Sequence, residues 1–411
     1  MPDFQKIRYI CDKTSGISER FVDAFLLYLC AEEEGLDKKF AQKLVKYQHI
    51  IKKMPEGWAS WLTSQYIAFQ LFRRGGLARK YINHPKVLKR SPKEIDYLKF
   101  QIGHPWRFVF CSVVRFLRDS FFEMTDILTG EKFLLYSPAV VNLEEEKGIF
   151  MYFLLIGFNG QCWQTYGSVS YFKGLFPFDL HYFAQQISSD PVSWDEIPML
   201  IEEDPLPFMM LWVGADSPLI IHKKDLLVYN SSAYRVEQFA SGEYNSKFFV
   251  EKKDGLYKLS LKRWHRFPHV CQCFYSERDQ ILFISAHTER GYEKLITVLN
   301  QIGHEFPLEA QNRATMVMLI IARDILGKEV DMNPYAKYFA EQPSPASPEE
   351  EKMMERLNYF GQLLVETINS GEKYDIAKLA KQAGIDYEDA KQIAASIERM
   401  IRRSQRVREL R

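Results

Sequence analysis

The residue types most able to do chemistry gather between residues 265 and 273, where two histidines and two cysteines follow one another closely. They form the pattern H-x3-H-x-C-x-C, and the residues are His265, His269, Cys271 and Cys273. All four are types that bind zinc, but closed zinc sites usually draw on two separated ligand pairs, and the sequence contains no second such pair. Because alternate residues of a strand point to the same face, both cysteines of VCQCFY lie on one face, and this arrangement is also expected of thiols buried in a core. We expect buried thiols here and no metal, with zinc as the alternative.

Basic and aromatic side chains are interleaved in the same stretch, from residue 262 to residue 267. Phosphate contacts need cations and base stacking needs aromatic rings, so this mixture is typical of nucleic-acid binding. The alternative is a purely structural role, in which the basic side chains at the end of a strand extend into solvent around one buried tryptophan that anchors the segment. The candidate nucleic-acid-binding residues of this stretch are Lys262, Arg263, Trp264 and Arg266.

A second basic segment, 399–411, contains six arginines and one glutamate. Its candidate residues for contact with a polyanion are Arg399, Arg402, Arg403 and Arg406. The preceding stretch, AKLAKQAGIDYEDAKQIAASI, resembles a helix-turn-helix, with Ala380 and Gly384 where the turn requires small residues. The second helix of that motif would begin with Asp386, Glu388 and Asp389, whose charges repel phosphates. We therefore favour a small helical bundle used for packing or partner binding.

Sequence motifs give catalysis little support, and we predict no catalytic residues and no cofactor. The chain has no G-x-S-x-G, Walker loop, G-x-G-x-x-G or H-E-x-x-H. Turn chemistry accounts for Asp126 and Glu131, and the acidic run 195–204 is expected to be a solvated loop. An enzyme of unrecognised class, with a site between the two β regions described below, stays open.

Composition indicates a globular protein with sizeable cores. The chain has 411 residues and a formal net charge of +1, so any binding to nucleic acid or to anionic lipid must be local. Apolar runs of signal-peptide or membrane-spanning length are lacking, which favours a cytoplasmic protein without a membrane partner. The six cysteines lie mostly in apolar segments, as expected of buried thiols rather than of a disulfide framework.

Periodicity and turn signals predict an α+β protein. Residues 1–103 have helical periodicity, and Ser91-Pro92-Lys93-Glu94 is a capping box. Strands then follow up to residue 172, separated by Asp119-Ser120, Thr129-Gly130 and Asn159-Gly160. The nearly continuous apolar run MYFLLIGF predicts a strand that is covered on both faces.

A second β region is expected from about residue 208 to residue 285. It includes a hairpin at Asp254-Gly255, and Thr288 should cap the helix that follows. A long helix is predicted over 308–326, and the Pro- and Ser-rich stretch 331–347 is expected to be a linker. The predicted parts are a helical domain (1–103), an antiparallel β-meander with a short helix (104–204), a second α+β domain (205–330), the linker (331–347) and a C-terminal small helical bundle (348–411).

Two stretches resemble a group of uncharacterised bacterial proteins. DILTGEKFLLYSP (126–138) resembles a β module of these proteins, and CQCFYSERDQILFISAHTERGYEKLITVLNQIG (271–303) resembles a strand-strand-helix unit in which the position of Arg290 is often basic. Proteins of this group often carry an SEC-C zinc module, whose cysteine cluster this chain lacks. The resemblance implies a bacterial, cytoplasmic and non-enzymatic protein.

The sequence thus leads us to expect a multi-domain interaction or scaffold protein with a protein partner engaged by the C-terminal module. Nucleic-acid binding through the two basic segments is the first alternative, and an enzyme is the second. Oligomeric state is left open.

Overall fold

The computed structural model confirms the α+β class, with helices before residue 104 and sheets in the middle of the chain. The chain forms two compact units, Met1–Tyr338 and Phe339–Arg411, which are described separately here. The residues that the structure describes are 3–144, 149, 151–188, 190–222, 224–328, 330, 333–339, 352, 353, 356, 357, 359–361, 363, 364, 367, 375–391 and 393–395.

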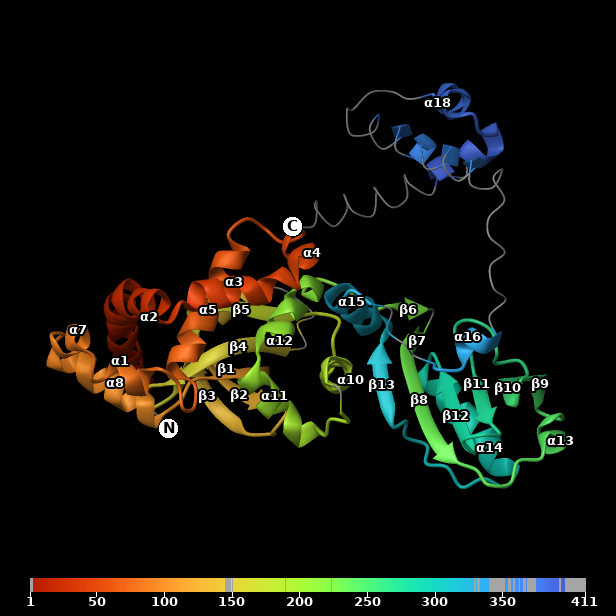
Figure 1. Ribbon diagram of the computed structural model, residues 1–411, viewed down its shortest axis with the longest axis horizontal. Helices are drawn as coiled ribbons and strands as arrows, with labels where there is room; N and C mark the ends of the chain where they lie inside the picture. The colour runs from red at the N-terminus through yellow and green to blue at the C-terminus, as the bar shows by residue number, and fades with distance from the viewer. Residues whose placement is uncertain are drawn as a thin grey trace. The chain divides into compact units, whose positions relative to one another are not determined.

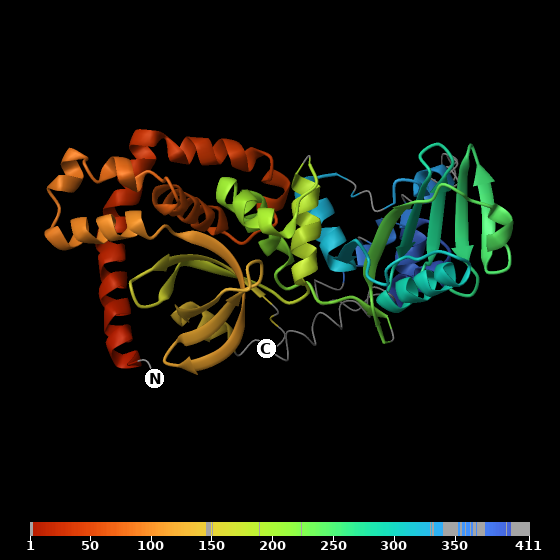
Figure 2. The ribbon, with the colours of Figure 1, turned by 90° about the horizontal axis from the view of Figure 1, so that it is seen from below.

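Helices make up the first hundred residues of unit 1. They are α1 (Phe4–Ile17), the π-helix η1 (Ser18–Leu26), α2 (Leu27–Glu34), α3 (Leu36–Val45), α4 (Gln48–Ile51), α5 (Trp58–Phe72), α6 (Ala78–Tyr81), α7 (Pro85–Leu88) and α8 (Pro92–Gly103). Gly35 ends α2 in the left-handed conformation, and Ser91 with Glu94 forms the predicted capping box of α8. Figures 1 and 2 show these helices, in red and orange, along one side of the yellow strands that follow.

Those strands close into a barrel with the order β1-β2-β3-β5-β4. They are β1 (Arg107–Arg118), β2 (Phe121–Asp126), β3 (Lys132–Tyr136), β4 (Met151–Phe158) and β5 (Trp163–Phe172), with helix α9 (Pro138–Glu144) after β3. The first three strands form a meander, but β3 and β5 pair in parallel, which closes the sheet. Positive φ angles at Asp119 and Ser120 form the expected tight turn between β1 and β2.

The barrel strand β4 is buried on both faces, as its apolar sequence predicts. Alternate residues point to opposite sides of a strand, so Met151 and Phe153 join a large core shared with the helices, while Tyr152 and Leu154 join the barrel interior. Phe110 of β1 stacks on Phe153 with ring centroids 4.3 Å apart. The barrel therefore packs against the helical layer through a continuous apolar face.

Helices also cover the barrel after residue 172. They are α10 (Pro177–Ile187), η2 (Trp194–Glu196), α11 (Ile197–Glu203), α12 (Leu206–Met210) and η3 (Leu211–Gly214). The prediction of a solvated loop over 195–204 is wrong, because Ser193 and Glu196 form a capping box and the apolar Ile197 and Ile201 are buried against the core. The limits predicted at residues 103, 204 and 330 all fall inside unit 1.

The second sheet of unit 1 has six antiparallel strands in the order β13-β8-β12-β11-β10-β9. The strands are β8 (Val228–Arg235), β9 (Phe248–Lys253), β10 (Leu256–Leu261), β11 (Gln272–Ser276), β12 (Ile281–Ala286) and β13 (Asn312–Thr315). Asp254 and Gly255 have the positive φ angles of the predicted hairpin turn, and Thr288 caps α14 (Glu289–Gln301), which packs on β8 and β12. The remaining elements here are β6 (Ile221–His222), β7 (Asp225–Leu226) and α13 (Ser241–Tyr244).

The helix predicted over 308–326 is shorter than expected. Residues 312–315 form strand β13 beside β8, and Thr315 then caps α15 (Met316–Leu326), which ends at the left-handed Gly327. The sequence reasoning was wrong here because apolar content alone does not distinguish an edge strand from a helical turn. The short helix α16 (Ala336–Phe339) follows.

Unit 2 has a small helical core of its own. Buried Phe360, Leu364, Leu379 and the alanines 380, 383, 390 and 394 form one cluster. Helix α18 (Ile376–Ala383) begins at the Asp375 cap and ends at Gly384 in the left-handed conformation. Helical residues 387–391 follow the turn, where both the helix-turn-helix and the small-bundle interpretation require a helix.

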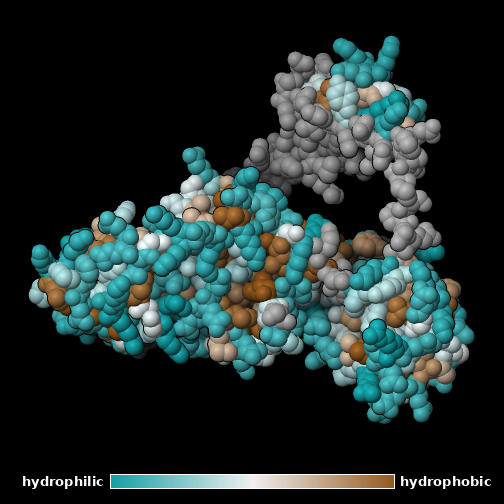
Figure 3. Space-filling view, viewed as in Figure 1, coloured by the Kyte–Doolittle hydropathy of each residue, from teal (hydrophilic) through white to brown (hydrophobic). Residues whose placement is uncertain are grey.

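The surface view of Figure 3 is hydrophilic over most of the visible face, with hydrophobic residues gathered around α10–α12. Among the residues that the structure describes, no helix has both the length and the apolar character required to cross a membrane.

A candidate ligand-binding pocket

A cavity of about 820 Å³ lies between the N-terminal helices and barrel strands β4 and β5. This volume is within the range of about 300–1,000 Å³ that is typical of small-molecule sites. Its helical wall comes from α1, η1, α2, α3, α5 and α8, and its strand wall comes from residues 157–158 and 164–168. The enzyme alternative placed a site between the two β regions, whereas this cavity lies beside the first β region alone.

The helical wall contains the π-helix η1, which supplies Ser18, Glu19 and Asp23 to the cavity. π-Helical turns are rare and occur frequently at functional sites, since the wider turn costs stability and changes where side chains point. Tyr166 of β5 donates a hydrogen bond from its phenol to the Asp23 carboxylate. This bond joins the helical wall to the strand wall across the cavity.

The strand wall is also irregular, because β5 has a bulge between its pairs with Phe153 and Leu155 of β4. Gly167 in this segment has a φ of +70°, and the bulge leaves neighbouring carbonyls unpaired in the ladder. The buried side chain of Gln65 donates to two of them, at 3.0 Å to Tyr166 and 2.7 Å to Ser168. A π-helix and a β-bulge thus face each other across one cavity.

A third contact fixes the inner end of the pocket. Trp106 donates from Nε1 to Oε1 of Gln101 at 2.8 Å, and Gln101 donates to the carbonyl of Phe158 at 3.1 Å. Gly157 leaves room for the indole, because a Cβ there would come within 2.6 Å of Trp106 Nε1. The indole also packs against the ring of Tyr166, with centroids 4.8 Å apart.

Charge in the cavity has one sign. Glu19, Asp23 and Asp37 line it, and its lining contains no lysine, arginine or histidine. None of these three carboxylates forms an ion pair within the described part of the chain. Burial raises the pKa of Asp23 above its ordinary value, the bond from Tyr166 opposes that rise, and the nearby Glu19 adds to it.

The rest of the lining can hydrogen-bond or stack. Hydroxyl and amide groups come from residues such as Thr63, Ser64 and Gln164. Two aromatic rings at the pocket are exposed, with 53% of Trp61 and 72% of Tyr28 accessible to solvent. The arrangement can therefore attract positive charge, bind hydroxyl groups and cover an apolar surface.

The four histidine and cysteine residues that opened the sequence analysis do not converge on one point. Cys271 donates from Sγ to the carbonyl of Gly291, and Cys273 is buried in the core beneath α14. His269 is hydrogen-bonded to Thr288, and His265 packs edge-on against Phe249. Among the described residues, no group of three or more His, Cys, Asp or Glu side chains is placed to hold a metal ion.

The structure places the basic and aromatic candidates of 262–267 at the end of β10. Lys262 donates to the carbonyl of Asn245 at 2.7 Å, and the indole of Trp264 lies between the ring of His269 and the guanidinium of Arg290. Arg263 and Arg266 are exposed. Nucleic-acid binding here stays a prediction; Arg399, Arg402, Arg403 and Arg406 lie outside the described residues.

Sequence reasoning missed the pocket because its residues come from six helices and two strands. No local sequence pattern marks the π-helix, and the bulge depends on pairing between strands. Gly167 within the run WQTYGSVSYF is the one local signal, since an isolated glycine in a strand indicates a bulge. Searches of protein-family models, curated proteins and solved structures found no match to this chain.

Proposed function

We propose that this protein binds a small organic cation in the pocket between η1 and β5. The observation that carries the proposal is a cavity of about 820 Å³ that is lined by three carboxylates and by no basic side chain. Carboxylates that lack a cationic partner favour a ligand of opposite charge, and the partial burial of Asp23 strengthens that preference by lowering the effective dielectric constant. The same field disfavours phosphates and carboxylates as ligands.

Asp23 is the residue expected to hold the positive group. Tyr166 donates to its Oδ1, which fixes the carboxylate within the pocket wall. Glu19 lies close enough to raise the Asp23 pKa, so a cation bound beside both would relieve their mutual repulsion. The N–H groups of the bound cation would then donate hydrogen bonds to the two carboxylates and balance their charge.

The apolar part of the ligand is expected to lie against Trp61. Exposed aromatic rings beside carboxylates are the usual elements of cation recognition, since the ring face attracts positive charge as well as apolar surface. Tyr28 provides a second ring at the pocket. We therefore expect a protonated amine that carries a flat or aliphatic group.

The test compares three probes that differ only in the terminal group. Tyramine presents an amine, 2-(4-hydroxyphenyl)ethanol a neutral hydroxyl, and 4-hydroxyphenylacetate a carboxylate. Titration calorimetry with the full chain should give the tightest binding for the amine and none for the carboxylate. Equal binding of the amine and the alcohol, or tighter binding of the carboxylate, would refute the proposal.

Substitutions in the pocket test whether the amine binds there. Asp23→Asn should weaken amine binding by about tenfold or more, as expected when a partly buried charge partner is lost. Trp61→Ala should weaken amine and alcohol alike, because both stack through the same ring. Asp96→Asn, at an exposed carboxylate on α8 that does not itself line the cavity, is the matched control and should leave the affinity unchanged.

A protein-interaction role for unit 2 stays a second proposal. The exposed Met353, Tyr359 and Tyr387 support it, because large apolar side chains on a small helical unit favour contact with another surface. Light scattering should compare the full chain with a chain that ends at Gln342. If the truncated chain has fewer subunits per particle than the full chain, unit 2 is responsible for self-association. If the number of subunits is unchanged, an external partner should be sought by crosslinking.

A further inference from the structure

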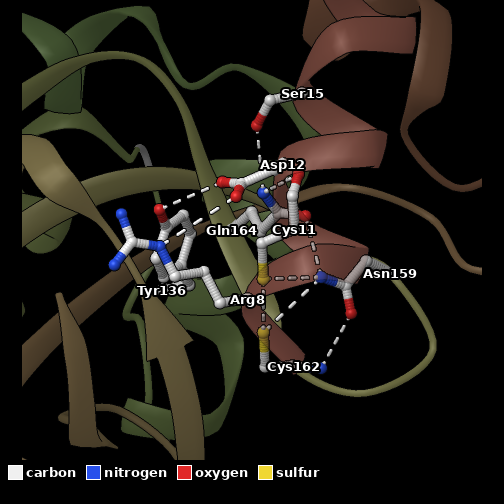
Figure 4. A network of polar contacts seen from close by, with 8 residues as sticks. All are labelled: Arg8, Cys11, Asp12, Ser15, Tyr136, Asn159, Cys162 and Gln164. Atoms are coloured by element: carbon white, nitrogen blue, oxygen red, sulfur yellow. Dashed lines mark hydrogen bonds and ion pairs between the residues drawn. The ribbon is translucent and has the colours of Figure 1, made fainter. Parts of the chain in front are cut away.

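Two cysteines that are far apart in sequence meet where α1 packs against the barrel (Figure 4). The Sγ atoms of Cys11 on α1 and Cys162 before β5 are 3.5 Å apart, and 151 positions separate the residues. Their exposed fractions are 0% and 1%, within a small apolar cluster that also contains Ile7 and Phe121. Cys30 and Cys111 are also buried free thiols, and they serve as a comparison because burial is the main cause of their raised pKa values.

An amide group is directed at both sulfurs. Nδ2 of Asn159 lies 3.3 Å from Sγ of Cys11 and 3.5 Å from Sγ of Cys162. The orientation of the amide is fixed, because its Oδ1 accepts hydrogen bonds from the backbone amides of Gln161 and Cys162, each at 2.9 Å. A donor held in this position stabilises negative charge on sulfur, which is the reactive form of a thiol.

The two thiols differ in acidity. The hydrogen bond between the two thiols lowers the pKa of Cys11 and outweighs the opposing effect of burial, while the same contact raises the pKa of Cys162. The pKa of Cys30 shifts in the opposite direction to that of Cys11, since burial is the largest influence on Cys30 and its pKa is raised to about 12. The amide of Asn159 also lies closer to Sγ of Cys11 than to Sγ of Cys162, so Cys11 is the member of the pair that is suited to attack an oxidant, and Cys162 is the resolving thiol.

We propose that Cys11 and Cys162 are a reversible dithiol–disulfide pair that a small peroxide oxidises. The Cys11 thiolate attacks one peroxide oxygen, the O–O bond breaks, and the departing hydroxide takes a proton to become water. Cys162 then attacks the sulfenic acid on Cys11; the S–S bond forms, the S–O bond breaks, and the second oxygen leaves as water with the Cys162 proton. Both sulfurs are oxidised, and one peroxide is reduced to two waters.

Oxidation has a structural route to the pocket. Gln164 donates from Nε2 to the carbonyl of Cys11 at 3.2 Å and lies 3.3 Å from the Ser15 hydroxyl, and both Gln164 and Ser15 line the cavity. A disulfide needs its sulfurs at about 2.05 Å, so bond formation must bring the side chains of Cys11 and Cys162 closer together and change the contacts between α1 and the turn at 159–162. The pocket is then expected to bind tyramine differently in the two redox states, an expectation that rests on the proposed function.

The experiment treats the native full chain with hydrogen peroxide, alkylates the remaining thiols under denaturing conditions, and maps peptides by mass spectrometry without reduction. We expect a Cys11–Cys162 cross-linked peptide with the loss of two hydrogens, which dithiothreitol abolishes. Because both sulfurs are shielded, a bulky aromatic disulfide should react far more slowly than peroxide. Recovery of both residues as alkylated thiols, or of Cys11 as sulfinic acid without a cross-link, would overturn the proposal.

Variants provide the control and separate this inference from the proposed function. Cys11→Ser and Cys162→Ser should each abolish the intramolecular cross-link, whereas Cys30→Ser, which removes a buried thiol of the same helical layer, should retain it. The wild-type peptide map decides the question even if a variant fails to fold. If the cross-link forms but the tyramine affinity stays the same, the proposal of a disulfide holds and only its coupling to the pocket is rejected.

Discussion

The side chain of Gln65 lies so close to the backbone of Gly167 that a Cβ on Gly167 would come within 2.6 Å of Gln65 Cγ. Gln65 also donates to the carbonyls on both sides of this glycine. Helix α5 and the bulge of β5 are therefore interlocked at one point. Because Tyr166 is the residue before the glycine, this contact also fixes the phenol that binds Asp23.

Gly167→Ala should lower the free energy of unfolding more than alanine at a glycine with open space around it. Both φ strain and collision with Gln65 act at this site, which together cost about 2–4 kcal/mol. Gly130→Ala is the matched control, since Gly130 has a similar φ of +73° and no atom within 4 Å of the added Cβ. Urea denaturation of both variants measures the difference, and equal losses would show that the contact with Gln65 is unimportant.

Thr315→Ala should destabilise the junction between β13 and α15. The buried Thr315 hydroxyl accepts a hydrogen bond from the amide of Met318 at 3.0 Å and so caps α15. Loss of such a cap costs about 1–2 kcal/mol. Thermal unfolding should show a lower midpoint for the alanine variant and a nearly normal one for Thr315→Ser, which keeps the hydroxyl; an equal loss in both would assign the effect to the methyl group.

The stability contributed by Asp179 should fall as pH rises. This buried carboxylate on α10 accepts from the amides of Phe176 and Thr315, each at 2.7 Å, yet burial raises its pKa to about 7. A folded pKa above the unfolded value of 3.8 means that the native state holds the extra proton between these two values, so stability is greatest at the acidic end and declines toward about pH 7.

Residue 179 does not titrate in Asp179→Asn, so the free energy of unfolding of this variant should fall relative to that of the wild type as the pH is lowered from 8 to 5. The expected change is roughly 1–3 kcal/mol, the size typical of a buried carboxyl whose pKa is strongly shifted. Urea denaturation at several pH values measures it. Asp96→Asn, at an exposed position, serves as the control, and parallel pH profiles for wild type and Asp179→Asn would contradict the assignment.

Ala390→Leu should disrupt the core of unit 2. Ala390 has no exposed surface and packs with Leu379 and Phe360, so three extra carbons have no space there. Overpacking of this kind costs about 1–3 kcal/mol. Hydrogen exchange of the full chain should become faster over 375–395, while Ala377→Leu, at an exposed site on α18, should leave protection intact. Unchanged exchange in Ala390→Leu would mean that the core is loosely packed.

The sequence by itself determined the local features of this fold. The tight turns at Asp119-Ser120 and Asp254-Gly255, the caps at Ser91 and Thr288 and the α+β class all follow from residues that act within a few positions of themselves. Such signals are readable because a φ angle or a cap bond depends on the residue and its near neighbours.

Tertiary structure decided the closure of the barrel, the helical form of 197–203 and the strand at 312–315, because each depends on a partner distant in sequence. The same holds for the candidate sites. Asp23 meets Tyr166, and Cys11 meets Cys162, only after the helices have packed on the barrel. Neither pair has a local pattern, since their energies arise from burial and from hydrogen bonds that exist only when distant segments exclude water between them.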